Sequence, residues 1–550
     1  MTPRRLVAVL VCAGFAATLQ AQQITFDRLL RADQEPHNWL MYSGNLQSHR
    51  HSRLTQITPA NVRNLELQWM LQVQSLEKFE ATPLVVDGVM YTVQPPNEVI
   101  ALDAVTGRVF WSYTYTPSTL ARPCCGRVNR GVAILGDTLF MGTLDGHVVA
   151  LDAKTGRVRW NVTVQGARPE AGYTFTVAPQ VVKDKVILGV AGGDFGVRGF
   201  LAAYDAATGK EMWRFYTTPG PGEPGNDTWS GESWKNGGAA VWVTGSYDPD
   251  LNLTYWGLGN PGPDWNGDGR LGDNLYSDSV VALDADTGAL KWHFQFTPHD
   301  EFDYDSTQVP VLADIEWQGR PRKAMLFANR NGFFYVLDRV TGEFLRGKEY
   351  VKVTWANGLD KKGRPNRVLN ASPEGTRIEP NVGGATNWYS PSYSPRTGLL
   401  YVSTAVNTFE IIRKTPGPVS FVEGQPFIGM FPGGILGPTT GIGGGRTNRR
   451  MPGEGHGVIQ ALDPLTGNKK WEYPLTDTSE AGVMSTASDL VFSASREGHF
   501  LALDAKTGAL LWRANVGASV AAAPMSYSVG GRQYVAVAAG NVLLAYALRQ

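Results

Sequence analysis

Residues 101–111 read Ala-Leu-Asp-Ala-Val-Thr-Gly-Arg-Val-Phe-Trp, and this motif decides the fold because it recurs along the chain. Close copies occupy residues 150–160, 203–213, 282–292, 461–471 and 502–512. A degenerate copy lies around residues 336–342, and a weaker one at residues 393–401 keeps only the turn. Together they make eight units, and a recurring short unit indicates a repeat architecture.

Each unit predicts a strand, a tight turn and a second strand. The apolar residues before Asp103 end the first strand, Asp-x-x-Thr-Gly forms the turn, and the glycine supplies a positive φ. The second strand ends in tryptophan, a large side chain suited to packing between neighbouring sheets. Upstream, an apolar hairpin such as residues 85–91 adds two strands. Four short strands per unit, arranged around an axis, predict an all-β, eight-bladed β-propeller.

A linear solenoid is the alternative architecture for such a repeat. It would need polar capping repeats at its ends. Both ends of the chain, at residues 39–44 and 534–546, instead have the apolar pattern of ordinary blade strands. We therefore expect one closed ring over residues 22–550, with a Gly- and Pro-rich insert at residues 405–457 that forms an ordered cap or a mobile lid.

The composition points to an exported globular protein. Lys plus Arg equal Asp plus Glu at 50 each, so no net charge favours nucleic acid or an anionic membrane. Residues 1–21 predict a signal peptide, with basic Arg4 and Arg5, an apolar stretch at residues 6–17 and a small residue, Ala21, at a plausible cleavage point. We expect a periplasmic protein with no membrane span in the mature chain; a retained N-terminal anchor is the alternative.

Four short segments carry a resemblance to a known family. They are Cys-Cys-Gly-Arg-Val-Asn-Arg-Gly at 124–131, Gly-Val-Arg-Gly at 196–199, Gly-Asn-Pro at 259–261 and Thr-Pro-His-Asp-Glu-Phe-Asp-Tyr-Asp at 297–305. With the tryptophan-bearing repeat, the chain resembles the quinoprotein alcohol dehydrogenases, the PQQ-dependent methanol and ethanol dehydrogenases. The resemblance covers essentially the whole mature chain.

The resemblance implies a PQQ pocket. It implies that Cys124 and Cys125 form a disulfide that lies against the cofactor, with Trp242 on the other side; two free, buried thiols are the alternative. It assigns two basic contacts to Arg130 and Arg330, which suit carboxylate and quinone oxygens. The remaining contacts that it implies are polar, backbone or aromatic: Glu80, Thr176, Gly192, Gly193, Asn387 and Trp388.

The resemblance also implies a metal site built from oxygen ligands. Its ligands here are Asp194, Asn260 and Asp303, and Asp194 stands where the family usually has the longer Glu. Asp305, two residues after Asp303, resembles an additional aspartate of lanthanide-using members. Calcium and a lanthanide(III) ion both remain open. The additional ligand Asp305 favours a lanthanide, whereas the shortened Asp194 favours calcium.

The chemistry that follows is the oxidation of a primary alcohol to an aldehyde. Asp303 acts as general base on the substrate hydroxyl, the cation polarises the C5 carbonyl of PQQ, and hydride passes to C5. The chain has no Cys-x-x-Cys-His motif for its own c-type haem, so a soluble periplasmic cytochrome c is the expected electron acceptor. A polyol, sugar or aldehyde dehydrogenase is the alternative enzyme, and an envelope propeller scaffold is the non-enzymatic alternative.

Two further features concern metal and substrate. Residues 264–269, Asp-Trp-Asn-Gly-Asp-Gly, match the start of an EF-hand calcium loop, although Leu275 stands where its closing Glu belongs. They suggest a second calcium site. Glu480 replaces a tryptophan of the family near the pocket mouth, which suggests polyol or amine-bearing substrates.

Overall fold

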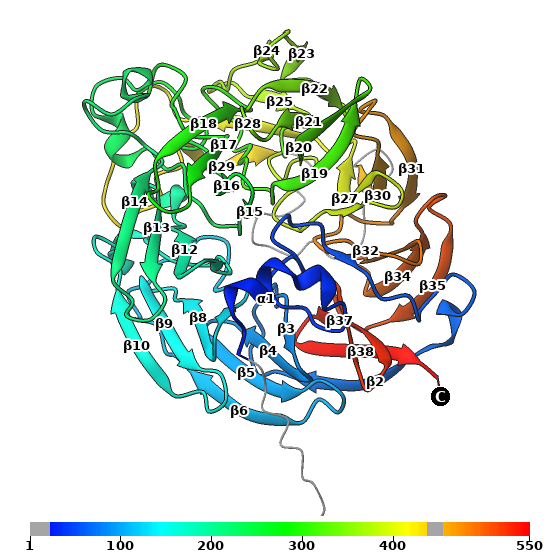
Figure 1. Cartoon of the computed structure of the whole chain (residues 1–550). Coiled ribbons are helices and arrows are strands. Elements are labelled where there is room, and N and C mark those ends of the chain that lie inside the picture. Colours follow the sequence, from blue (N-terminus) through cyan, green and yellow to red (C-terminus); the bar gives the residue numbers. More distant parts are fainter. Residues whose placement is uncertain (1–22, 437–454, 550) are drawn as a thin grey trace, which may run out of the picture.

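The computed structural model describes residues 23–436 and 455–549. The expected signal peptide at 1–21 and the part of the insert at 437–454 lie outside these residues. Eight sheets of four main strands surround a common axis in the described residues (Figure 1). This arrangement confirms the predicted all-β, eight-bladed propeller. The single α-helix of the described chain is α1 (Phe26–Leu30), and no helix there is long and apolar enough for a membrane span.

The blades follow one another along the chain, numbered here from the first complete one. Blade 1 is β3 to β6 (Leu84–Val86, Val89–Gln94, Glu98–Asp103, Val109–Thr114). Blade 2 is β7 to β10 (Ala133–Leu135, Thr138–Gly142, His147–Asp152, Val158–Thr163). Blade 3 is β11 to β14 (Gln180–Val182, Lys185–Gly189, Phe200–Asp205, Glu211–Tyr216). Blades 4 and 5 are β15 to β18 (Ser246–Asp248, Leu253–Gly257, Ser279–Asp284, Leu290–Gln295) and β19 to β22 (Val311–Trp317, Arg320–Ala328, Phe333–Asp338, Phe344–Glu349).

The last three blades are less uniform. Blade 6 is β26 (Ser392–Ser394), β27 (Leu399–Val406), β30 (His456–Leu462) and β31 (Lys469–Pro474). Blade 7 is β32 to β35 (Met484–Thr486, Leu490–Ala494, His499–Asp504, Leu510–Asn515), extended by β1 (His51–Ser52). Blade 8 is β36 to β38 (Met525–Val529, Arg532–Ala539, Val542–Leu548) and β2 (Leu65–Gln72).

The ring closes through a strand from near the N-terminus. β2 pairs antiparallel with β38, from Leu65 opposite Leu548 to Gln72 opposite Val542, and the two lie side by side in Figure 1. The solenoid alternative is therefore wrong. So is the expectation that residues 39–44 form a blade strand, because only an isolated bridge joins Trp39 to Val85 there.

The predicted number of blades is correct, but the eight sequence units do not correspond one to one with the eight blades. The weak copy at residues 393–401 is the β26–β27 hairpin, which shares blade 6 with the copy at residues 461–471. Blade 8 contains no copy of the motif. Its four strands come from both ends of the chain, so no single stretch of sequence could show it.

A tryptophan on the edge strand of one blade bonds to the turn of the next at six of the eight junctions among the described residues. Trp69 donates its indole N–H to the carbonyl of Ala104 at 3.1 Å, and Trp111 does the same to Ala153 at 3.2 Å. The turn glycine makes room for the ring: a β-carbon on Gly107, at φ +73°, would lie 2.7 Å from Trp69. The Thr-Gly turn therefore reverses the chain direction and also packs against the tryptophan ring of the neighbouring blade.

The segment that follows blade 5 packs beside the ring instead of joining it. β23 (Ala356–Leu359) pairs with β24 (Pro365–Arg367), and β25 (Thr376–Ile378), β28 (Glu410–Lys414) and β29 (Met430–Leu436) form a three-stranded sheet. Within the described part of the 405–457 insert, β28 and β29 contribute two strands to this sheet. Residues 427 and 428 hydrogen-bond to the loops that carry Asp194 and Trp265.

Candidate active site

One cavity of about 210 Å³ gathers all fifteen residues that the sequence analysis selected. They are Glu80, Cys124, Cys125, Arg130, Thr176, Gly192, Gly193, Asp194, Trp242, Asn260, Asp303, Asp305, Arg330, Asn387 and Trp388. The fold explains why residues so far apart in sequence meet. Second strands of successive blades run in the same direction, so the loops after β12, β16 and β20 emerge on one face of the ring and bring Asp194, Asn260 and Arg330 together there.

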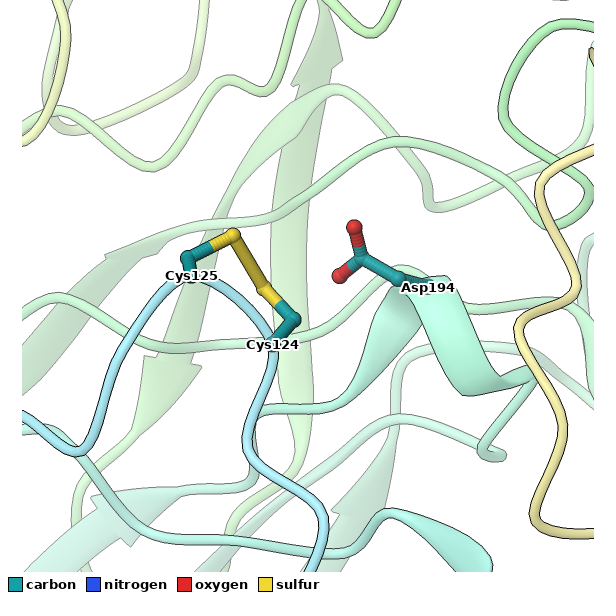
Figure 2. A group of neighbouring side chains, drawn as sticks. All are labelled: Cys124, Cys125 and Asp194. Carbon is teal, nitrogen blue, oxygen red and sulfur yellow. A yellow bond between two sulfur atoms is a disulfide. The ribbon is translucent and has the colours of Figure 1, made fainter. Parts of the chain in front are cut away.

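The adjacent cysteines form a disulfide, not two free thiols. Figure 2 shows it facing the carboxyl group of Asp194, which projects from the short helical turn η4 (Gly193–Phe195). The two sulfur atoms and an Asp194 oxygen lie within 4.8 Å of one another. Because thiolates and not disulfide sulfurs bind metals, this trio is not itself a metal site. The disulfide instead forms an uncharged wall opposite an acid.

At one end of the cavity, charged groups are already paired. Arg130 lies 2.8 Å from a carboxyl oxygen of Glu80 and donates to the Thr176 hydroxyl at 2.9 Å and to the Trp242 carbonyl at 3.0 Å. Its guanidinium carbon also lies 5.0 Å from the Trp242 ring centre and 5.2 Å from that of Trp388. Burial raises the pKa of Glu80, and the positive charge of Arg130 opposes that rise. We call this group the paired end.

The other end collects oxygen ligands. We call Asp194, Asn260, Asp303 and Asp305 the acidic centre. Arg330 holds two of its members, with a nitrogen 2.9 Å from Asp303 and another 2.6 Å from Asp305. The backbone amide of Asn260 donates to the second oxygen of Asp305 at 2.9 Å. Two carboxylates therefore share one guanidinium, and no basic group of the described residues contacts the carboxyl of Asp194.

Burial makes two carboxyl groups of the acidic centre harder to ionise than free aspartates. Burial raises the pKa of Asp194 to about 6, and the charge of Asp305 adds to this rise. Burial also raises the pKa of Asp303 well above its ordinary value; Arg330 lowers it, while Asp305 and Asp194 raise it. Carboxyl and amide oxygens with unbalanced charge suit a hard cation, so these residues fit the calcium or lanthanide that the sequence suggested.

The loop that carries Asp303 is held by a residue that the sequence analysis did not select. Asp300 is fully buried, and its carboxyl oxygens accept from the amides of Phe302 at 3.0 Å and Tyr304 at 2.7 Å. Asp303 itself has φ +59°, a left-handed conformation that is strained for a residue with a side chain. An aspartate that precedes such amides is a recognisable turn signal, which could have revealed this role.

Two side chains of the EF-hand-like segment are paired with other groups of the protein, and a second calcium site there stays a prediction. Asp268 pairs with Lys414 at 2.6 Å, and the Asn266 amide donates to the carbonyls of Thr415 and Gly417, both at 2.8 Å. Asp264 is buried. The side chains that would begin a calcium loop therefore do not share one partner.

At the mouth of the cavity, the carboxyl group of Glu480 is paired with a lysine and is not a free acid as the sequence suggested. Glu480 lies on its lining, but Lys78 lies there too, and the two form an ion pair at 2.8 Å. The lysine neutralises the charge that would attract an amine-bearing substrate. The two residues are 402 positions apart, so the sequence held no sign of their contact.

Comparisons with known proteins agree with this geometry. The family described as "Glucose/ethanol/alcohol dehydrogenase, beta-propeller domain" matches residues 39–361, and that of the outer membrane protein assembly factor BamB matches residues 455–549. The chain is 40% identical to the quinohemoprotein alcohol dehydrogenase ADH-IIG of Pseudomonas putida, over 97% of this chain and 77% of that protein. It is 38% identical to the 1-butanol dehydrogenase (cytochrome c) of Thauera butanivorans, over 89% and 72%. A solved europium-containing methanol dehydrogenase has a TM-score of 0.86 at 33% identity, covering 95% of this chain and all of that one.

The fold is a β-propeller, and the loops on one face of its ring line the cavity described above. The chain belongs to the family of PQQ-dependent alcohol dehydrogenases. It is therefore an oxidoreductase that acts on the CH–OH group of alcohols, and the hypothesis of a non-enzymatic scaffold is wrong.

Proposed function

We propose that this protein oxidises primary alcohols to aldehydes in the periplasm and passes the electrons to a soluble cytochrome c. One observation carries the proposal: all fifteen residues selected for PQQ, cation and catalysis line a single cavity. The periplasmic location rests on the signal-like pattern of residues 1–21. The acceptor rests on the cytochrome c named for the Thauera relative.

The residues present fit PQQ, a planar tricarboxylate. The disulfide and Trp242 offer two surfaces for a flat ring system, and Trp388 extends the aromatic side. Arg130 keeps donors beside this space, held in place by Glu80 and Thr176. Asn387 and the backbone around Gly192 and Gly193 add polar contacts around the rim. A cation, calcium or a lanthanide, would be held by the oxygens of the acidic centre.

In the reaction, Asp303 takes the proton of the substrate hydroxyl onto a carboxyl oxygen. Arg330 stabilises the ionised form of this base, because its guanidinium contacts Asp303 directly. Asp300 fixes the loop conformation that points the base into the cavity. When bound, PQQ supplies the quinone carbonyl at C5 that accepts hydride, and the cation supplies the positive charge that polarises it.

A dye-linked assay on the purified apoprotein tests the proposal. PQQ is added with either calcium or a light lanthanide, and primary alcohols, polyols, aldoses and aldehydes are offered in turn. We expect turnover of primary alcohols with one of the two ions. Faster turnover of polyols, aldoses or aldehydes would instead support the alternative substrate classes, and no PQQ uptake with either ion would contradict the proposed cofactor site.

A further inference from the structure

Glu410 is a buried acid at the start of β28, in the sheet that the insert helps to form. Its side chain belongs to a residue that is 1% exposed, and no lysine or arginine of the described residues forms an ion pair with it. Ile412, two residues further along the same face of the strand, is apolar and also buried. An apolar side chain would therefore suit the position of Glu410, whereas a buried carboxyl group costs free energy. The contact that its oxygen makes explains the acid.

This contact leads from Glu410 to Arg330 through one residue. A carboxyl oxygen of Glu410 accepts from the backbone amide of Val382 at 3.1 Å. The carbonyl of Val382 accepts in turn from Nε of Arg330 at 2.9 Å and from one of its terminal nitrogens. The two terminal nitrogens also contact Asp303 and Asp305. Val382 therefore fixes the direction in which the guanidinium presents its donors to the two acids.

The backbone that follows Val382 encloses Arg330. A β-carbon on Gly384, at φ +77°, would lie 2.1 Å from Cγ of Arg330, so this backbone touches the side chain directly. The amide of Ala385 donates to the carbonyl of Arg330 at 2.9 Å. A shift of this segment would therefore move Arg330 with it, and the hydrogen bond to Glu410 ties the segment to the insert sheet.

We propose that Glu410 is a positioning residue of the active site and that, through Val382, it holds the guanidinium of Arg330 against the general base Asp303. The inference rests on the proposed function, in which Arg330 stabilises the ionised base and is a basic contact for PQQ. Glu410 does not line the cavity, so it acts through Arg330. The insert thereby supports the active site from a sheet outside the ring of blades.

Three single variants of the purified full-length chain separate positioning from stability. Glu410→Ala removes the acceptor of the Val382 amide, whereas Glu410→Gln keeps an oxygen that can accept the same hydrogen bond. The matched control is Asp248→Asn, since this acid is also buried and lies 2.7 Å from a nitrogen of Arg339. Asp248 ends β15 at the turn into β16, and the opposite end of β16 leads to the cavity.

The measurements include one that needs no turnover. PQQ is titrated into the apoprotein in the presence of the cation, and its dissociation constant is obtained from the quenching of tryptophan fluorescence. The dye-linked assay gives kcat and KM, and thermal unfolding gives the stability of each variant. If Glu410→Ala does not fold, Glu410→Leu takes its place, because a leucine fills the site and still removes the acceptor.

We expect Glu410→Ala to weaken PQQ binding and to lower kcat, each by about 10- to 100-fold, with a smaller change in KM for the alcohol. Glu410→Gln should keep both values within about 3-fold of wild type, because its oxygen restores the hydrogen bond. Asp248→Asn should lose stability but keep both values within about 2-fold, since it shares no partner with the site.

A double-mutant cycle tests whether the effect passes through Arg330. Lysine cannot reproduce the fork of donors, so adding Glu410→Ala to Arg330→Lys should change kcat by less than about 2-fold. An equal loss of kcat in both backgrounds would overturn the inference. So would an equal loss in Asp248→Asn, or PQQ affinity and kcat that both stay within about 2-fold of wild type in Glu410→Ala. A wild-type protein that binds no PQQ would contradict the proposed function itself, and the inference would fall with it.

Discussion

The two ends of the cavity solve the problem of buried charge in opposite ways. At the paired end, Glu80 and Arg130 are 3% and 5% exposed and neutralise each other within the protein. At the acidic centre, Arg330 is shared between two acids while Asp194 has no basic partner in contact. The charges of the paired end are balanced within the protein, whereas those of the acidic centre are not. If the proposed sites are correct, the paired end is preorganised for PQQ, and the acidic centre gains its balance from a bound cation.

The largest effect is expected from removing the base at the acidic centre. Asp303→Asn keeps an oxygen ligand and the side-chain shape but cannot take the substrate proton. We expect kcat to fall about 10²- to 10⁴-fold, the usual contribution of a general base, while PQQ and metal uptake persist. Steady-state kinetics and cofactor stoichiometry on the same preparation measure both. A variant that retains more than a tenth of kcat would assign the base to another residue.

At the paired end, removing one charge should cost more than removing both. Arg130→Gln leaves Glu80 buried without its cation, a change that typically costs about 3–5 kcal/mol. The Glu80→Gln, Arg130→Gln double variant removes that unpaired charge, so its stability should recover partly while PQQ affinity stays low. Denaturant unfolding and PQQ titration of the three variants give the comparison. A double variant as unstable as Arg130→Gln would show that the pair is not the source of the loss.

Metal removal should destabilise the protein more as pH rises. Because the pKa of Asp194 is raised to about 6 in the folded chain, its proton stabilises the fold fully below about pH 4, and this contribution is lost as pH rises through 6. Asp303 shifts in the same direction. A cation binds the ionised carboxylates, so the Tm difference between cation and chelator should widen from pH 4 to 7. A constant difference over this range would mean that these acids do not hold the cation.

The sequence predicted those parts of the fold that depend on residues adjacent in the chain. The turn in Asp-x-x-Thr-Gly depends on neighbouring residues: Asp103 accepts from the amides two and three positions ahead, at 2.8 and 3.0 Å. Such a turn has the same sequence pattern in every blade that contains it. The closure of β2 on β38 joins residues about 480 positions apart, and ordinary strand residues make it. Nothing in either segment alone identifies its partner, and for that reason the eighth blade was assigned to the wrong residues.

At the candidate site, too, contiguous motifs could be predicted from the sequence, whereas contacts between distant residues could not. Cysteines, arginines and aspartates in distinctive short motifs were identified because each motif is contiguous. The partners of Asn266 and Asp268 were not predicted, because the sequence pattern does not reveal which way a side chain points. The pair of Lys78 and Glu480 was missed, since two ordinary surface residues acquire meaning only when the ring brings them together.

The smallest effect is expected at the mouth, where Lys78 and Glu480 are 45% and 29% exposed. An ion pair this exposed contributes about 0–1 kcal/mol to stability, so Lys78→Gln should unfold like wild type. It would, however, leave Glu480 unneutralised beside the entrance. We expect kcat/KM for a cationic amino alcohol, relative to ethanol, to rise a few-fold at low salt and to fall again as salt screens the charge. Glu480→Gln should shift the same ratio in the opposite direction, since Lys78 would then repel the cation. If both variants leave the ratio unchanged, substrates do not pass this ion pair, and the entrance to the cavity lies elsewhere on its rim.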